Sequence, residues 1–238
     1  KRICVQTLKY PKLVDDLVYM ISRIKERTNI PVSACLNPLD KKSLKRLKVA
    51  GLGGVGVGLD CASEKIFKKM KPSFKWNDYI KFLNDVTDVF GSGSAHLIAG
   101  LGETDEEIIK MFQKIVDINC YPALFAFTPV KGINIDYPQP GIERYRAIQL
   151  ARYLIVNNMA RYEDMVFENG KLSSINILSS VLEDVLKNGK PFQTSGCPDC
   201  NRPFYNEKPG GIMYNYPYPL KKDEMKNVKD ELKRYLRI

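Results

Sequence analysis

The chain has 238 residues, 44% hydrophobic and 27% charged, a balance that excludes a disordered protein and allows one large domain or one domain with an appendage. No apolar run approaches the roughly 20 residues that span a bilayer, and no signal-peptide pattern precedes the first strand-like run, so we expect no membrane partner. The formal net charge of +10 suggests anionic partners. Because the lysines are dispersed over helix faces with few aromatic residues among them, we expect a solvated surface and no nucleic-acid interface.

The cysteines are scattered and are not needed as staples in a large α/β chain, which predicts a reducing, cytoplasmic location. They are Cys4, Cys35, Cys61, Cys120, Cys197 and Cys200.

Strand and helix patterns alternate along the first 160 residues. Strands are predicted at residues 2–8, 31–36, 54–60, 93–99 and 121–128, and helices at 13–27, 40–50, 63–70, 76–89, 104–118 and 141–157. Thr104 and Glu107 have the spacing of a capping box at the start of one helix. The order predicts an α/β fold with a parallel sheet. The near-continuous apolar strands indicate burial on both faces, and on pattern alone a parallel barrel and a doubly wound sheet fit equally well.

Beyond residue 160 the composition of the sequence and its hydrophobic pattern change. We expect an amphipathic helix at 172–188, an irregular stretch rich in Pro, Gly, Asn and Tyr at 190–220, and a charged terminal helix at 221–237. The chain is therefore divided into a domain at 1–160 and a C-terminal extension at 161–238.

Candidate ligand-binding residues follow the predicted strands, where the loops of a parallel barrel build its site. Asp60 ends a Gly-rich strand that lets backbone or a ligand come close, and its carboxylate suits ribose hydroxyls. The alternative is an N-cap for the helix that starts near Ser63. The turn Gly100-Leu101-Gly102-Glu103 brings bare backbone to the barrel mouth, where it could meet a flat base, or it is simply a tight turn.

Other site classes are weakened by the sequence. His96 is the only histidine, which nearly excludes a His-dependent triad or a multi-His metal site, and a core role for it is favoured. Cys61 could face the site from its position after Asp60. Gly53-Gly54-Val55-Gly56 precedes its strand, where a dinucleotide-binding fingerprint would follow one.

Cys197 and Cys200 form a CxxC near the C-terminus. This spacing fits two thiolate ligands of zinc or an iron–sulfur cluster. A thioredoxin-like redox pair and a loop with two free thiols are the alternatives. The loop-like Asn201-Arg202-Pro203-Phe204-Tyr205 favours metal binding, with further ligands from Ser195 or from cysteines outside the chain.

Four signatures in order resemble the biotin-synthase-like branch of the radical S-adenosylmethionine (SAM) enzymes over about residues 2–160. They are Val5-Gln6-Thr7, Gly58-Leu59-Asp60, the run His96–Thr104, and FTPVKG at 127–132. The segment SGCPDCNRPFYNEKPGG at 195–211 is most similar to the two-component archaeal-type lipoyl synthases, which insert sulfur into an octanoyl group.

This resemblance implies a 4Fe–4S cluster held by a CxxxCxxC loop, which binds SAM and cleaves it to a 5′-deoxyadenosyl radical. By the same resemblance Asp60 contacts the SAM ribose, and the backbone around Ile98, Gly100, Gly102 and Glu103 shapes the adenine pocket. Cys197 and Cys200 then belong to an auxiliary iron–sulfur cluster. The implied partners are an acidic lipoyl carrier domain or similar acyl-carrier protein, and a second radical SAM subunit.

The sequence departs from the family pattern because it has no CxxxCxxC. Its first strand resembles the family's second, so we expect a partial barrel that lacks its first strand. A piece of a longer enzyme, inactive alone, is favoured over a degenerate partner, because a missing strand exposes an edge. Another biotin-synthase-like reaction and a non-catalytic SAM-binding scaffold are the alternative functions.

Overall fold

The structure is a computed structural model that describes residues 2–130, 132, 136–197, 200, 207 and 210–237. Five strands form one sheet in the order β1-β2-β3-β4-β5, and every neighbouring pair is parallel. The strands are β1 (Ile3–Gln6), β2 (Val32–Leu36), β3 (Gly54–Asp60), β4 (Gly93–Ala99) and β5 (Cys120–Ala126). The predicted α/β class with a parallel sheet is confirmed.

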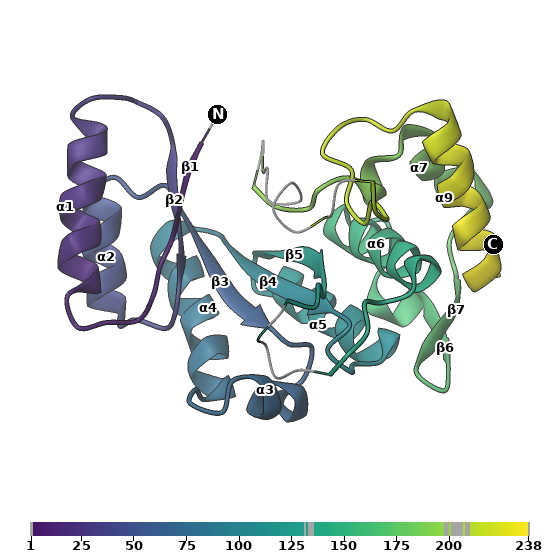
Figure 1. Cartoon of the computed structure of the whole chain (residues 1–238), viewed down its shortest axis with the longest axis horizontal. Helices are drawn as coiled ribbons and strands as arrows, with labels where there is room; N and C mark the ends of the chain where they lie inside the picture. Colours follow the sequence, from purple (N-terminus) through teal and green to yellow (C-terminus); the bar gives the residue numbers. More distant parts are fainter. Residues whose placement is uncertain are drawn as a thin grey trace.

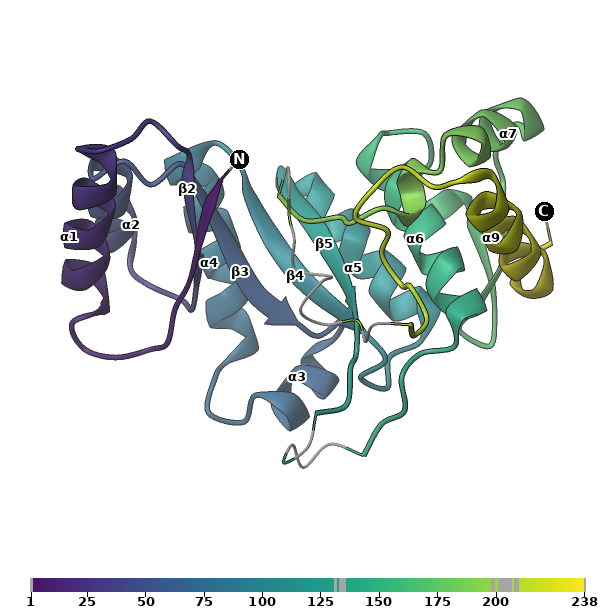
Figure 2. The same ribbon diagram turned by 45° about the horizontal axis from the view of Figure 1, so that its top comes forward.

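Helices connect each strand to the next parallel strand and lie along one side of the sheet (Figure 1). They are α1 (Leu13–Lys25), α2 (Lys41–Val49), α3 (Glu64–Met70), α4 (Trp76–Phe90) and α5 (Asp105–Asp117). α4 packs on β3 and β4, and α5 packs on β4 and β5. Figure 2 shows α1 and α2 beside β2, at the opposite end of the sheet from α6 (Ile142–Val156).

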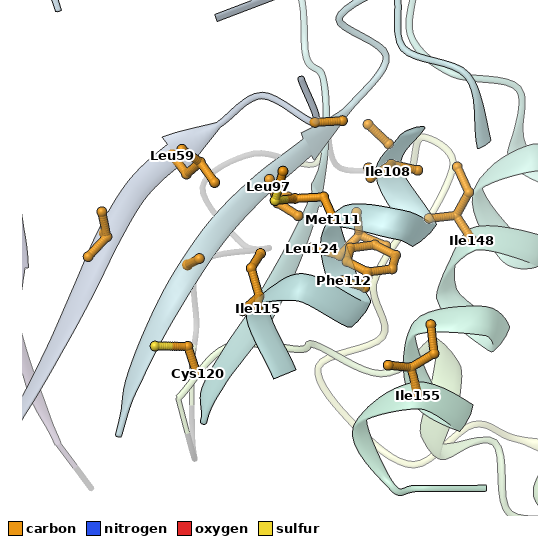
Figure 3. Close-up of a cluster of buried hydrophobic side chains, with 14 of the residues drawn as sticks. Leu59, Leu97, Ile108, Met111, Phe112, Ile115, Cys120, Leu124, Ile148 and Ile155 are labelled. Carbon is orange, nitrogen blue, oxygen red and sulfur yellow. The ribbon is translucent and has the colours of Figure 1, made fainter. Parts of the chain in front are cut away.

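The hydrophobic core lies between the sheet and these helices (Figure 3). Leu59, Leu97 and Leu124 point from β3, β4 and β5 toward Phe112 and Ile115 of α5, and all five are nearly inaccessible to solvent. The helix begins with the predicted capping box: Thr104 Oγ1 accepts from the Glu107 backbone N–H at 3.1 Å, and the Glu107 carboxylate accepts from the Thr104 N–H at 2.9 Å. This cap fixes the start of α5 next to the β4 turn.

The opposite face of the sheet, called here the inner face, is only partly covered. Burial alternates along β4, where Ala95, Leu97 and Ala99 are buried and the residues between them are half-buried. The expectation of strands buried on both faces is therefore wrong for this strand. The apolar run concealed the alternation because His96 and Ile98, both on the inner face, stand among apolar residues.

The C-terminal extension differs from its prediction at one element. Residues 165–175 form an antiparallel hairpin of β6 (Met165–Glu168) and β7 (Lys171–Ile175), and the helix α7 is confined to Ser179–Asn188. The expected helix at 172–188 is wrong over its first part. Asn169 and Gly170 both have positive φ, at 51° and 77°, as a two-residue type I′ turn between paired strands requires.

The extension is fastened to α6 by a buried arginine. The Arg146 guanidinium donates to the backbone oxygens of Met213 and Tyr214, each at 2.6 Å, and to Glu231 at 2.9 Å. Glu231 belongs to the terminal helix α9 (Lys222–Tyr235). Two 3-10 turns, η1 (Tyr162–Asp164) and η2 (Lys190–Phe192), complete the described elements. Within the described residues, no helix has the length and apolar character needed to cross a membrane.

Candidate functional site

Polar side chains from neighbouring segments lie over a row of three glycines on the inner face of β3. A Cβ added at Gly54 would meet Ser33 Oγ at 3.1 Å, one at Gly56 would meet His96 Nε2 at 2.9 Å, and one at Gly58 would meet the Asp60 carboxylate at 3.7 Å. The glycine pattern thus makes room for the protein's own polar groups along the whole strand. The inner face is therefore the polar surface of the sheet.

Asp60 stands at the C-terminal end of this row. Its φ is +61°, and the β3–β4 register shifts between Val57 and Asp60. Lys71 Nζ lies 2.6 Å from Asp60 Oδ2, and both side chains remain partly accessible. Ser63, and not Asp60, occupies the N-cap position of α3. The helix-cap alternative for Asp60 is wrong, and its ion pair with Lys71 engages only one of the two carboxylate oxygens.

Aromatic rings fix the position of Lys71. Its ammonium lies 5.0 Å from the centre of the Tyr79 ring and also donates to the Gly58 carbonyl. The Tyr79 hydroxyl donates to Asn37 Oδ1 at 2.7 Å, and burial raises the pKa of Tyr79. Asn37 follows β2. The ends of β2 and β3 are thereby joined through one network around Asp60.

Glu103 holds the turn after β4 closed. Its two carboxylate oxygens accept from the backbone N–H groups of Gly100 and Leu101, each at 2.8 Å. Arg144 on α6 donates to Glu103 Oε1 at 2.8 Å and, through Nε, to Asp105 Oδ1 at 2.7 Å. The Glu103 side chain is 1% exposed, so only the backbone of this turn is placed to meet a ligand.

The two glycines of that turn contact the segment before α6. A Cβ at Gly100 would meet Pro140 at 3.0 Å, and one at Gly102 would meet the Tyr137 hydroxyl at 3.1 Å. Ile98 lies opposite Phe125 in the β4–β5 register, on the half-buried inner face. The structure brings Asp60 and the turn to the same C-terminal end of the sheet, and Tyr137 and Pro140 border the turn.

Cys197 and Cys200 lie at the other end of the sheet. They line a cavity of about 590 Å³ together with Arg2, Ser33, Ser94 and Tyr121. Ser33, Ser94 and Tyr121 stand near the N-terminal ends of β2, β4 and β5. Arg2 donates to Ser33 Oγ at 2.7 Å, whereas its buried Nε has no hydrogen-bond partner among the described atoms. The cavity is therefore polar on its sheet side.

The CxxC is tied to β5 by Ser195. The Ser195 hydroxyl accepts from the Leu124 N–H at 2.8 Å and donates to the Leu124 carbonyl at 3.2 Å, which satisfies both edge groups of the strand. Because this oxygen is engaged on the strand, Ser195 is not placed as a cluster ligand, contrary to expectation. The Cys200 N–H donates to the Cys197 carbonyl at 3.0 Å, closing a turn.

The cysteines differ in how deeply their thiols are buried. Burial raises the pKa of the Cys197 thiol, with the Arg2 charge acting in the opposite direction. Cys61 is fully buried, and burial raises its pKa to about 12, so it does not face the site. Cys120 is buried beside the Thr87 hydroxyl at 3.1 Å, as a small core residue. Cys35 Sγ lies 3.8 Å from His96 Nδ1 on the inner face.

The described residues do not fit a complete iron–sulfur site. In the part of the chain that the structure describes, no three side chains of His, Cys, Asp or Glu converge as a metal site. Cys197 and Cys200 offer two thiols, whose role as metal ligands stays a prediction, and the predicted loop at 201–205 lies outside the described residues. Asp60, with a partly accessible carboxylate at a strand end, fits a hydroxyl-bearing ligand such as a ribose.

The part of the chain that contains the first four strands resembles a known protein family. Residues 1–115 match the family model described as the radical SAM superfamily. Over this segment, just under half of the chain, the protein is similar to the radical SAM superfamily. Biotin synthases are similar to part of this chain: that of Sulfurihydrogenibium sp. (strain YO3AOP1) is 32% identical over 121 residues, covering 50% of this chain and 36% of the relative. The biotin synthase of Clostridium acetobutylicum is 25% identical over 143 residues, covering 59% and 43%.

Solved structures support the same fold. HydG, a maturase of the [FeFe]-hydrogenase, has a TM-score of 0.56 at 16% identity and covers 68% of this chain and 40% of HydG. Methylornithine synthase (PylB) has a TM-score of 0.52 at 11% identity and covers 66% and 48%. The chain thus spans less than half the length of these relatives. The fold is that of a partial radical SAM barrel.

Some residues of the site were not found from the sequence. Lys71 and Arg144 hold the two acidic side chains at the C-terminal end, and Arg2 lines the CxxC cavity. Lys71 follows Asp60 only after a helix, and Arg144 lies on a helix after a long loop. Their sequence positions carry no local signal, because the contacts depend on tertiary packing.

Proposed function

We propose that this chain is part of a radical SAM enzyme of the lipoyl synthase type, which inserts sulfur into an octanoyl chain on a carrier protein. The cofactors of this proposal are SAM, the 4Fe–4S cluster of the superfamily and an auxiliary iron–sulfur cluster. When bound, the 4Fe–4S cluster would supply the electron that cleaves SAM. The chain's own residues would bind and orient the cofactor and the substrate.

One observation carries the proposal: the inner face of β3 joins two candidate centres. The Asp60–Lys71 pair lies at its C-terminal end and the CxxC cavity at its N-terminal end. Gly54 and Asp60 begin and end β3, so at about 3.3 Å per residue the two ends lie about 20 Å apart. An extended octanoyl chain is shorter than this separation, so it would lie between the two centres and would share the inner face with His96, which stands over Gly56.

Asp60 would accept hydrogen bonds from the SAM ribose. Lys71 pairs with one carboxylate oxygen of Asp60, and the other oxygen would accept from the ribose. The turn closed by Glu103 would present its backbone to the adenine ring. Hydrogen bonds from hydroxyls to an ionised carboxylate are stronger than those to a neutral acceptor, so this contact would give much of the affinity.

The 4Fe–4S cluster is not assigned to residues of this chain. Because no three ligand side chains converge among the described residues, its ligands would come from a longer form of the protein or from a second radical SAM subunit.

Cys197 and Cys200 would hold part of the auxiliary cluster. A reactive dithiol has a lowered thiol pKa, whereas burial raises the pKa of Cys197. This direction disfavours thiol–disulfide exchange. A bound metal would also have to displace the thiol proton, so the CxxC spacing, and not the pKa, supports the cluster. The formal net charge of +10 suits docking of an acidic lipoyl carrier domain.

Metal analysis of the full-length protein tests this function. After anaerobic reconstitution with iron and sulfide, we expect Cys197→Ala and Cys200→Ala to lose iron and absorbance near 400 nm. Cys120→Ala, which removes a core thiol, is the matched control and should retain both. A full-length protein that binds no cluster would overturn the proposal. If Cys200→Ala still inserts sulfur into an octanoyl-lysine peptide by mass spectrometry, the CxxC does not hold a cluster that the reaction needs. If the unaltered full-length protein binds a cluster but inserts no sulfur into this peptide, another biotin-synthase-like reaction is favoured.

A further inference from the structure

A groove separate from both centres lies between α7 and α9, at the end of the molecule away from β1 (Figure 1). Its volume is about 530 Å³. The floor is apolar and is formed by Leu186, Leu220 and Met225, and the rim carries Lys187, Lys222, Lys226, Lys229 and Lys233 with a single acidic residue, Asp230.

The floor is built by a specific backbone conformation. Gly189 ends α7 with a φ of +66°. A Cβ at this position would meet Met225 Sδ at 2.9 Å and Leu220 Cβ at 3.4 Å. The glycine therefore lets Met225 and Leu220 pack against the end of α7, which gives the groove a continuous apolar base.

Four of the rim lysines form one stripe along α9. Lys222, Lys226, Lys229 and Lys233 recur at helical spacing and share a face. The other side of α9 is used by the fold: Val228 and Leu232 are buried, and Glu231 pairs with Arg146. The stripe is thus free of any packing role in the core.

The positive charge of the stripe is little neutralised by acidic groups of the chain. Among the described residues, these four ammonium groups form no ion pair, whereas their helix neighbour Arg234 pairs with Glu143. Lys187 pairs with Asp184 at 3.0 Å, and both of those side chains are largely exposed. Like charges three and four residues apart on a helix repel each other. An external group of opposite charge would relieve this repulsion.

We propose that the groove between α7 and α9 binds an acidic segment of a protein partner, with its carboxylates on the lysine stripe and an apolar side chain on the floor. The geometry favours a protein over a nucleic acid because the described residues that line the groove include no aromatic ring to stack a base. A helix with carboxylates flanking an apolar residue matches both parts of the groove. The proposal goes beyond the proposed function, since the binding requires neither SAM nor a cluster.

Binding of a synthetic peptide to the chain tests this proposal without any turnover. The probe is an amphipathic helical peptide with glutamates flanking leucines, measured by fluorescence anisotropy at about 0.15 M salt. We expect the double variant Lys226→Glu/Lys229→Glu to weaken binding by about tenfold or more. The matched control is Lys42→Glu/Lys45→Glu on α2, a pair with the same spacing, which should change binding by about twofold at most.

Two further measurements separate the alternatives. Met225→Ser should weaken binding of the peptide severalfold while leaving its salt dependence unchanged, because it alters only the floor. Equal losses in the two charge-reversal variants, or no binding of the peptide by the unaltered chain, would overturn the proposal. So would a single-stranded RNA oligonucleotide that binds more tightly than the peptide and loses affinity in Lys226→Glu/Lys229→Glu. Thermal unfolding checks that each variant is folded.

Discussion

Lys71 Nζ lies 2.6 Å from Asp60 Oδ2, at the point where β3 ends in a left-handed residue. The pair joins the sheet to the segment after α3, and it leaves one carboxylate oxygen of Asp60 without this partner. The same row of inner-face groups leads from this pair to the CxxC cavity. Both candidate centres therefore share one surface of the partial barrel.

Asp60→Asn should weaken SAM binding by about tenfold or more, because a hydroxyl then loses a charged acceptor. Asparagine tolerates the positive φ of this position, so the fold should be retained. Isothermal titration calorimetry measures the effect. Asp88→Asn, which breaks the exposed 2.6 Å pair with Lys41, is the control. Equal affinity in all three proteins would remove Asp60 from the binding site.

Glu103→Gln should destabilise the fold by about 3 kcal/mol, because the amide cannot accept both turn N–H groups and Arg144 loses one of its two acidic partners, keeping only Asp105. Urea denaturation measures the loss. Glu107→Gln keeps an oxygen for the capping box and should cost less than about 1 kcal/mol. A variant at 103 that loses SAM affinity with unchanged stability would instead place the carboxylate against the ligand.

Ser195→Ala should free the CxxC from β5 and leave the Leu124 N–H without its partner. The expected loss of stability is about 1–3 kcal/mol. Alkylation of Cys197 and Cys200 by iodoacetamide should become faster, as read by mass spectrometry. Thr194→Ala, which removes only a 3.5 Å contact to the Tyr216 carbonyl, serves for comparison. Unchanged alkylation rates in Ser195→Ala would show that other contacts position the two thiols.

Cys61 predicts a loss of stability in alkali. Burial raises its pKa to about 12 in the folded protein, above the value of about 8.5 in an unfolded chain. The folded state thus holds this proton more tightly, and the associated stability is complete below about pH 8.5 and is lost as pH rises toward 12. Cys61→Ala should show a shallower decline of the unfolding free energy from pH 9 to 11, whereas Cys4→Ala should follow the unaltered chain. Parallel curves for all three proteins would contradict this.

The sequence predicted those elements whose signals are local. Thr104 and Glu107 gave the capping box, and the alternating patterns gave all five parallel strands and their helices. The β6–β7 hairpin had a signal that was missed: Asn169-Gly170 is a strong type I′ pair. The helical reading of 172–188 prevailed because Leu172 and Ile175 also fit a helix face.

The sequence analysis named the acidic residues of the candidate site, but it did not name the lysine and the arginine that pair with them. Asp60 and Glu103 stand next to strand ends, where parallel topology concentrates ligand-binding groups. Lys71 and Arg144 reach them from helices or their ends, so only packing reveals the pairs. Packing also separated Cys61, buried in the core, from Cys197 and Cys200, which line a cavity.

Asp105 has a consequence for the order of folding. Its carboxylate accepts a hydrogen bond from the Leu172 N–H at 2.9 Å and another from the Tyr235 hydroxyl at 2.8 Å. Tyr235 lies 130 positions away from Asp105 in the chain. Contacts over such a separation form late, because the intervening chain must first be ordered. During synthesis on the ribosome, the start of α5 therefore waits for the last helix before this buried carboxylate gains all its partners. Removal of the last helix should slow refolding of the barrel and expose it to proteases.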